Sequence, residues 1–203
     1  MNTKLMEQFD GALSHVKRDG MEEFLQWLKT ETDYFTAPAS TSFHNNHEGG
    51  LLEHSLNVLR FALHNFNLIV KYNPELEYLK ESIIISALFH DLCKVNFYKK
   101  EEKWTKDANN KWKSYLGWGV DNKFPLGHGE KSLYLLAKFI DLTDGEALAI
   151  RWHMGYSEMS VNVYGTSQKF AFDQAIEHPL VRIIHTADLL AISLEKHTNY
   201  KTL

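Results

Sequence analysis

The chain has 203 residues, of which 44% are hydrophobic and 24% are charged, as expected for one globular domain with a sizeable core. Its 11 glycines and 4 prolines argue against a fibrous or linker-rich protein. The net charge of −4 excludes a globally basic nucleic-acid binder but leaves room for a local basic patch. One cysteine, a polar N-terminus and the lack of an apolar run of about 20 residues predict a cytoplasmic protein without a membrane span.

The first 50 residues predict two packing helices followed by a loop. Apolar residues recur at helical spacing between positions 4 and 30. From 31 to 50 the pattern breaks at Pro38 and at several small polar residues, which indicates a loop that ends at a helix start. The two histidines of this loop, His44 and His47, precede the first candidate ligand and could reach a substrate, but we expect them to be exposed.

The next two segments predict helices with buried faces. Residues 51–72 have helical periodicity, and His54 falls on an apolar face, so we expect this histidine to point inward. The segment 83–89 is apolar all round, and its length from Pro74 to Leu92 favours a helix over a strand.

Residues 95–127 predict a β-hairpin insertion, because aromatic and charged residues occur there without helical spacing around a turn at 107–110. Lysines beside aromatic rings suit a single-stranded nucleic acid or a nucleotide base. Hairpins also commonly expose lysines on one face and bury aromatic residues on the other. We favour a lid or packing role at the border of the site, with nucleic-acid contact as the alternative.

The remaining sequence predicts three more helices, at 128–139, 143–154 and Pro179–Glu195. Thr143 is the expected N-cap of the second, with Glu146 completing a capping box. The predicted fold is mainly α, a helical bundle with a β-hairpin. The expected organisation is one domain over 1–203, with N-terminal helices in 1–40, a core in 41–203 and the insertion at 95–127.

Three polar sites fall where the pattern predicts burial. Asp188 shares an apolar stripe of the last helix, the dipeptide His90-Asp91 ends the most apolar helix, and His54 lies on an inward face. A buried carboxylate is costly unless it is neutralised, paired or bound to a metal. Imidazole and carboxylate groups from different helices are ligands of Zn, Mn and Fe, so one metal centre explains all three sites. Two further histidines stand at helix ends where they can join it: His128 and His153.

The order of these residues resembles that of the HD-domain metal-dependent phosphohydrolase superfamily. The resemblance covers about residues 44–194. Within the superfamily, the sequence is similar to a group of bacterial and phage HD-domain hydrolases. It implies an HD-type helical bundle with hydrolase activity. Its most specific stretches are Gly49–Ser55, Leu88–Lys94, Phe124–Ser132 and Arg151–Gly155.

The resemblance also implies a ligand set for two divalent cations, with Fe or Mn favoured and Zn, Mg, Ni and Co as further candidates. Asp91 would bridge the two ions, and single-metal members of the superfamily lack the two middle histidines. The ligands of the first ion would be His54, His90, Asp91 and Asp188, and those added for the second would be His128 and His153.

Lys94 matches a lysine that follows the His-Asp pair in many members, where it contacts substrate phosphate. The resemblance therefore implies that Asp91 and Lys94 are catalytic and that Lys94 also binds substrate. Arg151 and Lys131 are weaker candidates for phosphate contact. Cys93 stands where the common pattern has glycine, and we expect a buried packing thiol. The other histidines are expected to have structural or surface roles: His15, His64, His178, His185 and His197.

These features predict a hydrolase of small phosphorylated substrates. Water bound to a metal has its pKa lowered to ~7, so hydroxide is available to attack phosphorus in line. We expect a dinuclear phosphohydrolase that cleaves a phosphomonoester or phosphodiester, with a nucleotide or nucleotide-derived substrate implied by the family. The pattern also resembles HD-type cyclic-dinucleotide phosphodiesterases and an HD-type exoribonuclease.

Two alternatives stay open. The same ordered ligands occur in mixed-valence diiron oxygenases such as myo-inositol oxygenase, and oxygen consumption would distinguish that chemistry from phosphate release. The second alternative is a non-catalytic nucleotide-binding module in which the metal only holds helices together. The sequence leaves the exact substrate, the native metal and the oligomeric state open.

Overall fold

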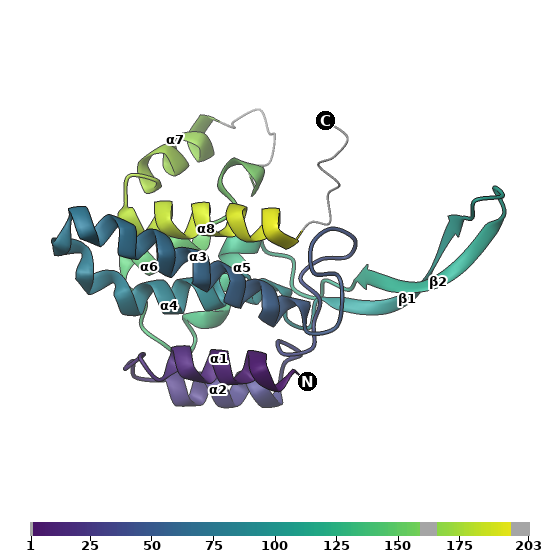
Figure 1. Cartoon of the computed structure of the whole chain (residues 1–203), viewed down its shortest axis with the longest axis horizontal. Helices are drawn as coiled ribbons and strands as arrows, with labels where there is room; N and C mark the ends of the chain where they lie inside the picture. Colours follow the sequence, from purple (N-terminus) through teal and green to yellow (C-terminus); the bar gives the residue numbers. More distant parts are fainter. Residues whose placement is uncertain (1, 159–165, 196–203) are drawn as a thin grey trace.

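The computed structural model describes residues 2–158 and 166–195 and confirms a mainly helical fold with one antiparallel β-hairpin (Figure 1). In this described part, no helix is both long and apolar enough to cross a bilayer. The helices and strands are α1 (Thr3–Leu13), α2 (Met21–Thr30), α3 (Gly50–Tyr72), α4 (Lys80–Phe89), β1 (Tyr98–Lys106), β2 (Trp112–Val120), α5 (His128–Leu136), α6 (Asp144–Arg151), α7 (Thr166–Ala175) and α8 (Pro179–Glu195). Short 3₁₀ helices are η1 (Pro74–Leu79), η2 (Leu92–Lys94) and η3 (Gly155–Glu158).

The centre of the molecule is a bundle in which α3 packs against α4 and α8. Helix α6 packs against α4, α5 and α8. Helices α1 and α2 cover one side of this bundle, α7 lies on the opposite side, and the hairpin projects away from the helices (Figure 1). Helix α4 is buried from Ser82 to Phe89, which explains why its sequence is apolar on every face.

Most predicted boundaries agree with the structure. Helix α8 has its predicted bounds, and the capping box of Thr143 and Glu146 at the start of α6 is present. The single helix predicted over 74–92 is wrong in part, because this segment forms η1 and the shorter α4. Asp91 leaves helical geometry with φ −100° and ψ 21°, so His90 and Asp91 lie in a turn. Helix α7 was not predicted.

An aromatic cluster supports the end of α4. The ring of Phe89 lies 4.8 Å from that of Phe24 and 6.2 Å from that of Phe9, edge to face in both pairs. The buried hydroxyl of Tyr34 donates a hydrogen bond of 2.6 Å to the Leu88 carbonyl. The N-terminal helices and the loop after them therefore hold the turn that begins at residue 90.

Two glycine positions allow close backbone approach around the site. Gly50, at the start of α3, has no room for a Cβ atom because the Asn45 carbonyl lies against it. Gly129, in the first turn of α5, faces the Arg151 carbonyl at the end of α6 in the same way. The absence of a side chain at these two positions allows the loop 31–49 to pack closely on α3 and the start of α5 to pack closely on the end of α6.

A buried ion pair ties the segment between α1 and α2 to α6. Arg18 donates hydrogen bonds of 3.0 and 2.8 Å to the two carboxylate oxygens of Glu146, whose side chain is fully buried. Arg18 also lies 3.4 Å from Glu81, which is about one-third exposed at 32%. One guanidinium thus has a buried carboxylate and a partly exposed one as partners.

We predict that Glu146→Gln lowers the free energy of unfolding by about 1.5–3 kcal/mol, because the variant leaves Arg18 with only the partly exposed Glu81 as its counter-charge. Glu81→Gln is the matched control, since this more exposed pair contributes at most about 1 kcal/mol. Urea unfolding at pH 7 measures both. An equal decrease in the free energy of unfolding in Glu146→Gln and Glu81→Gln would contradict the prediction.

The pH dependence of unfolding provides a second check of this ion pair. Burial alone would raise the pKa of Glu146, but its hydrogen bonds from Arg18 and Thr143 lower it. A lowered pKa in the folded state adds stability above the unfolded-state pKa, and this stability is lost as pH falls through the folded-state value. The difference in free energy of unfolding between the wild type and Glu146→Gln, measured by urea unfolding, should therefore become smaller at acidic pH.

Candidate functional site

Four separate segments bring buried imidazole and carboxylate groups together. His54 comes from α3, His90 and Asp91 from the turn after α4, His153 from the turn after α6, and Asp188 from α8. All five are at most 3% exposed. The inward orientation predicted for His54 is confirmed.

The donor atoms of these residues converge. His54 Nε2 lies 3.3 Å from His90 Nε2, 3.2 Å from Asp188 Oδ1 and 3.5 Å from Asp91 Oδ2. Asp91 Oδ2 is also 3.5 Å from His90 Nε2, and Asp91 Oδ1 is 3.5 Å from His153 Nε2. The carboxylate of Asp91 therefore connects two groups of ligand atoms, one with each oxygen.

Each of these histidines has its Nδ1 atom engaged, which leaves Nε2 directed at the cluster. The Nδ1 atoms of His90 and His153 each lie 2.8 Å from the backbone carbonyl three residues earlier, at the end of their helices. His54 Nδ1 lies 2.9 Å from Glu195 Oε2. A carbonyl can only accept a hydrogen bond, so it selects the tautomer in which Nε2 is available to a cation.

Glu195 is a member of this site that the sequence did not reveal. Its carboxylate is buried between His54 Nδ1 and the side-chain amide of Asn57, which donates a hydrogen bond of 2.7 Å to Oε1. Asn57 is a polar residue of α3, three residues after His54. The sequence therefore showed a polar residue beside the predicted ligand, but Glu195 is 141 residues from His54 along the chain.

Two buried polar atoms in the cluster lack a hydrogen-bond partner among the described residues. They are Asp91 Oδ1 and His153 Nε2, which face each other at 3.5 Å. Buried polar atoms are seldom left unsatisfied, because each carries a desolvation cost. A cation between a carboxylate oxygen and an imidazole nitrogen satisfies both, so this donor set fits a metal ion.

Charge also distinguishes the members of the cluster. Burial alone would lower the pKa of His54, but hydrogen bonds with Asp188 and Glu195 raise it to about 9. Burial would raise the pKa of Asp91, but the charges of Lys94 and His90 lower it well below its usual value. Asp91 therefore stays ionised at neutral pH, as a metal ligand must.

Lys94 is nearly buried and lies beside Asp91, with Nζ 2.6 Å from Oδ2. It lines a cavity of about 410 Å³ that also reaches His54, Asp91, His128 and Asp188. The rest of the wall includes apolar side chains, namely Phe43, Phe97, Val120, Met154 and Ile192. The cavity thus joins a cationic group and the His/Asp cluster to an apolar wall.

His128 lines the same cavity but is not in the convergent groups. Its Nδ1 atom lies 3.2 Å from Cys93 Sγ, and its ring is 6.3 Å from that of Phe97. Among the described residues, no group of three or more metal-ligating residues with donor atoms within 4.8 Å of one another includes His128. Cys93 is buried as expected, and burial with the nearby charge of Asp91 raises its pKa to about 12, so it is a neutral thiol.

The structure gives Arg151 and Lys131 other contacts than the cavity. Arg151 forms a 2.6 Å ion pair with Glu130 and stacks over the Trp152 ring. Lys131 is buried, with its ammonium 5.1 Å from the centre of the Phe97 ring. The residues that line the cavity in the described structure include neither of them.

His44 lies closer to the site than expected. It is partly buried, its ring is 4.8 Å from that of His54, and it lines the cavity. Burial and the charges of His54 and Lys94 lower its pKa to about 4, so it is neutral at pH 7. The expectation that His44 is exposed was wrong because the loop 31–49 folds over α3. The prediction for His197 concerns a residue outside the described part of the chain.

Comparison with known proteins gives one partial similarity. The chain is 38% identical over 68 residues to the dihydroneopterin 2',3'-cyclic phosphate phosphodiesterase of Methanocaldococcus jannaschii. The match covers 32% of this chain and spans about a quarter, 26%, of the length of that relative. No protein-family model and no solved structure matches the chain.

We predict that Glu195→Gln destabilises the protein in chelator by about 1.5–3 kcal/mol, because it removes a charged partner of the buried His54 imidazole. The matched control is Glu53→Gln, which neutralises the residue before His54. Glu53 is 40% exposed and pairs with His47, so its loss costs at most about 1 kcal/mol. Guanidinium unfolding measures both variants, and equal midpoints for Glu195→Gln and wild type would contradict the assignment.

Proposed function

We propose that this protein is a metal-dependent phosphodiesterase that hydrolyses a nucleotide or nucleotide-derived substrate. One observation carries the proposal: two carboxylates and three imidazoles converge in the interior, with two unsatisfied atoms between them, beside a cavity that holds a lysine. Such a set is costly for a protein interior and useful for a cation. The lysine adds the charge that a phosphate needs.

The residues that would hold a first divalent cation are His54, His90, Asp91 and Asp188. Asp91 Oδ1 and His153 Nε2 offer a second position beside it, for which His128 is the further candidate on the same cavity wall. Bound divalent cations would supply Lewis-acid stabilisation of the phosphate and a lowered pKa of coordinated water. Fe and Mn remain the metals that we favour.

The chain's own groups would bind and orient the substrate. Lys94, held 2.6 Å from Asp91, would pair with a non-bridging phosphate oxygen and offset the charge that develops during in-line attack. The apolar wall formed by Phe97, Met154 and Ile192 would bind the organic group of the ester. Hydrolysis would consume one water, form one P–O bond to its oxygen and break one P–O bond of the ester. The products would be an alcohol and a phosphomonoester, which stay on one molecule when the ester is cyclic.

The comparison supports phosphodiester chemistry over the alternatives. The relative from M. jannaschii is named for a 2',3'-cyclic phosphate, which is a phosphodiester. The resemblance to HD-domain phosphohydrolases points to the same reaction class. Because the same ordered ligands occur in diiron oxygenases, the diiron alternative becomes an outcome of the assay.

The first test is hydrolysis of a panel of 2',3'-cyclic nucleotides, cyclic dinucleotides and bis(p-nitrophenyl) phosphate by anaerobically purified protein with Fe²⁺ or Mn²⁺ added. We predict turnover without oxygen uptake, and complete loss of turnover with reduced metal content in Asp91→Ala. The control is Asp173→Ala, a carboxylate on α7 outside the cavity lining. Full activity in Asp91→Ala, or oxygen-dependent turnover, would refute the proposal.

The second test separates Lys94 from the ligands. We predict that Lys94→Ala keeps its metal but loses about 100-fold in kcat, because a buried charge that stabilises the transition state is removed. Lys99→Ala, an exposed lysine on the hairpin, is the control. Steady-state kinetics and metal analysis of both variants decide the point, and loss of metal from Lys94→Ala would assign this lysine a structural role instead.

A further inference from the structure

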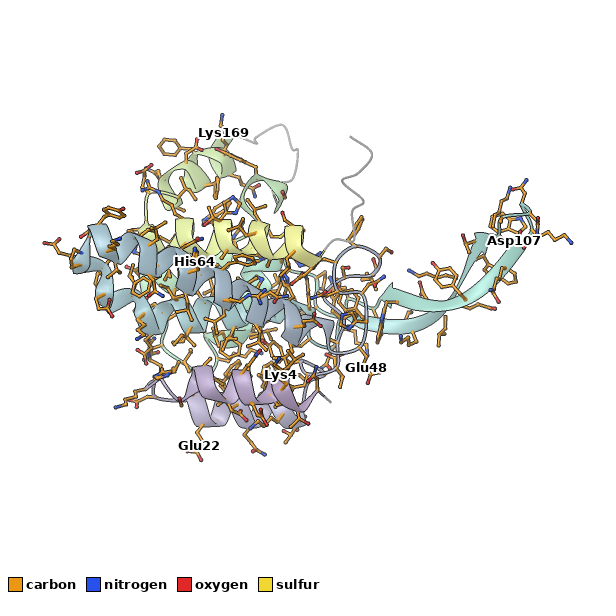
Figure 2. All side chains as sticks on the ribbon, viewed as in Figure 1. Lys4, Glu22, Glu48, His64, Asp107 and Lys169 are labelled. Carbon is orange, nitrogen blue, oxygen red and sulfur yellow. The ribbon has the colours of Figure 1, made fainter. Side chains whose placement is uncertain are left out.

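The β-hairpin contradicts the expectation that its aromatic residues are buried. Strands β1 and β2 leave the helical body, and Asp107 lies at the far tip (Figures 1 and 2). Trp104 and Trp112 are 60% and 66% exposed, and Leu116 is 69% exposed. Large exposed apolar side chains grouped on one element indicate an interaction surface.

The strand register places most of these residues on one face. Cross-strand partners share a face and successive residues alternate between faces, and Tyr98 pairs with Val120 at the base while Lys106 pairs with Trp112 near the tip. One face, which we name the aromatic face, therefore consists of Tyr98, Lys100, Glu102, Trp104, Lys106, Trp112, Ser114, Leu116, Trp118 and Val120. The other face carries Lys99, Glu101, Lys103, Thr105, Lys113, Tyr115, Gly117 and Gly119.

The aromatic face is continuous with the catalytic cavity. Tyr98 and Val120, the pair at its base, line that cavity. The next cross-strand pairs of this face follow at about 7 Å intervals along the strands. Counted from the base, Trp118 belongs to the second pair, Trp104 to the fourth and Trp112 to the fifth. A linear polymer whose end occupies the cavity would therefore contact a series of rings along the part that extends out of the cavity.

The charge of the hairpin favours an anionic occupant. Residues 98–120 contain six lysines and three carboxylates, a net charge of +3 in a chain whose net charge is −4. Two of these lysines lie over rings of the aromatic face, with Lys100 Nζ 3.6 Å from the Trp118 centroid and Lys106 Nζ 5.4 Å from that of Trp112. Cations beside rings can pair with phosphates while bases stack on the rings.

We propose that the aromatic face binds single-stranded nucleic acid and directs its terminal phosphodiester into the cavity. This inference rests on the proposed phosphodiesterase function and names its substrate class as an oligonucleotide end. The cavity of about 410 Å³ is the size of a site for one small ligand, so the rest of the strand lies outside it on the hairpin. A second copy of the chain is a less suitable occupant, because two hairpins that pack together bring two charges of +3 into contact.

Binding of fluorescein-labelled dT12 and rU12 to the full-length protein by anisotropy tests this proposal. The double variant Trp104→Ala/Trp112→Ala should bind about tenfold or more weakly, because base stacking is lost, and Trp104→Phe/Trp112→Phe should restore most of the affinity. The matched control is Tyr115→Ala, which removes a 48% exposed ring from the other face and should bind normally. The two probes show whether DNA or RNA is preferred.

The salt dependence of binding tests the lysines of the aromatic face. Lys100→Ala/Lys106→Ala should reduce the slope of log affinity against log salt by about 1.4, because each phosphate contact in a single strand contributes about 0.7. Lys99→Ala/Lys113→Ala, on the other face, should change the slope less. Equal effects of the two lysine pairs, or equal losses in the tryptophan variant and Tyr115→Ala, would overturn the proposal.

The outcomes distinguish this inference from the function on which it rests. If bis(p-nitrophenyl) phosphate is hydrolysed while the tryptophan variant binds oligonucleotides as tightly as the wild type, the inference fails and the proposed phosphodiesterase function stands. If the face binds oligonucleotides while no phosphodiester is cleaved, the proposed function and the assignment of a substrate fail, and only the binding of nucleic acid by the aromatic face stands. A concentration-dependent dimer that the tryptophan variant abolishes, without oligonucleotide binding, would also overturn the inference.

Discussion

Burial of two aspartates among three imidazoles is the constraint on which this structure depends. Asp91 and Asp188 are each 3% exposed, a state that costs several kcal/mol per charge unless opposite charge offsets it. Lys94 and His54 supply part of that charge. The facing atoms Asp91 Oδ1 and His153 Nε2 remain unsatisfied in the described structure, and this is where cation binding would contribute most.

The fold builds this site by ending two helices at its edge. Helices α4 and α6 both stop one or two residues before a histidine, His90 and His153, and each histidine Nδ1 contacts a carbonyl of the helix it follows. Two longer helices, α3 and α8, cross the same point and contribute His54 and Asp188. The hydrophobic packing that fixes these four helices thus also fixes the positions of the donor atoms.

Sequence patterns predicted most of the fold because the signals were local. Proline at the start of α8 and the capping box of α6 determine helix starts by short-range hydrogen bonding and backbone restriction. Helix α7 escaped prediction because its apolar pattern is weak, with Phe172 and Ala175 as its buried residues. The aromatic side chains of the hairpin were expected to be buried on one face, in a lid or packing role, because ring hydrophobicity alone does not reveal that an element leaves the body of the protein.

The convergence of His54, His90, Asp91 and Asp188 followed from the sequence because each lies where an apolar pattern is interrupted by a polar group. His153 was predicted from its place at a helix end and from the resemblance. Glu195 and His44 gave no such signal, since their proximity to His54 depends on how α8 and the loop 31–49 pack. His128 reaches the cavity wall but not the convergent groups. Long-range packing, rather than local pattern, decides these three positions.

Metal content shows most directly whether the buried His/Asp cluster binds cations. Elemental analysis of protein purified anaerobically without chelator, with and without Asp91→Ala, counts the ions per chain. We expect one or two divalent transition-metal ions per chain in the wild type, near zero in the variant, and a lower unfolding temperature after chelation. A wild-type protein that binds no added Fe²⁺ or Mn²⁺ and unfolds at the same temperature with or without chelator would contradict it.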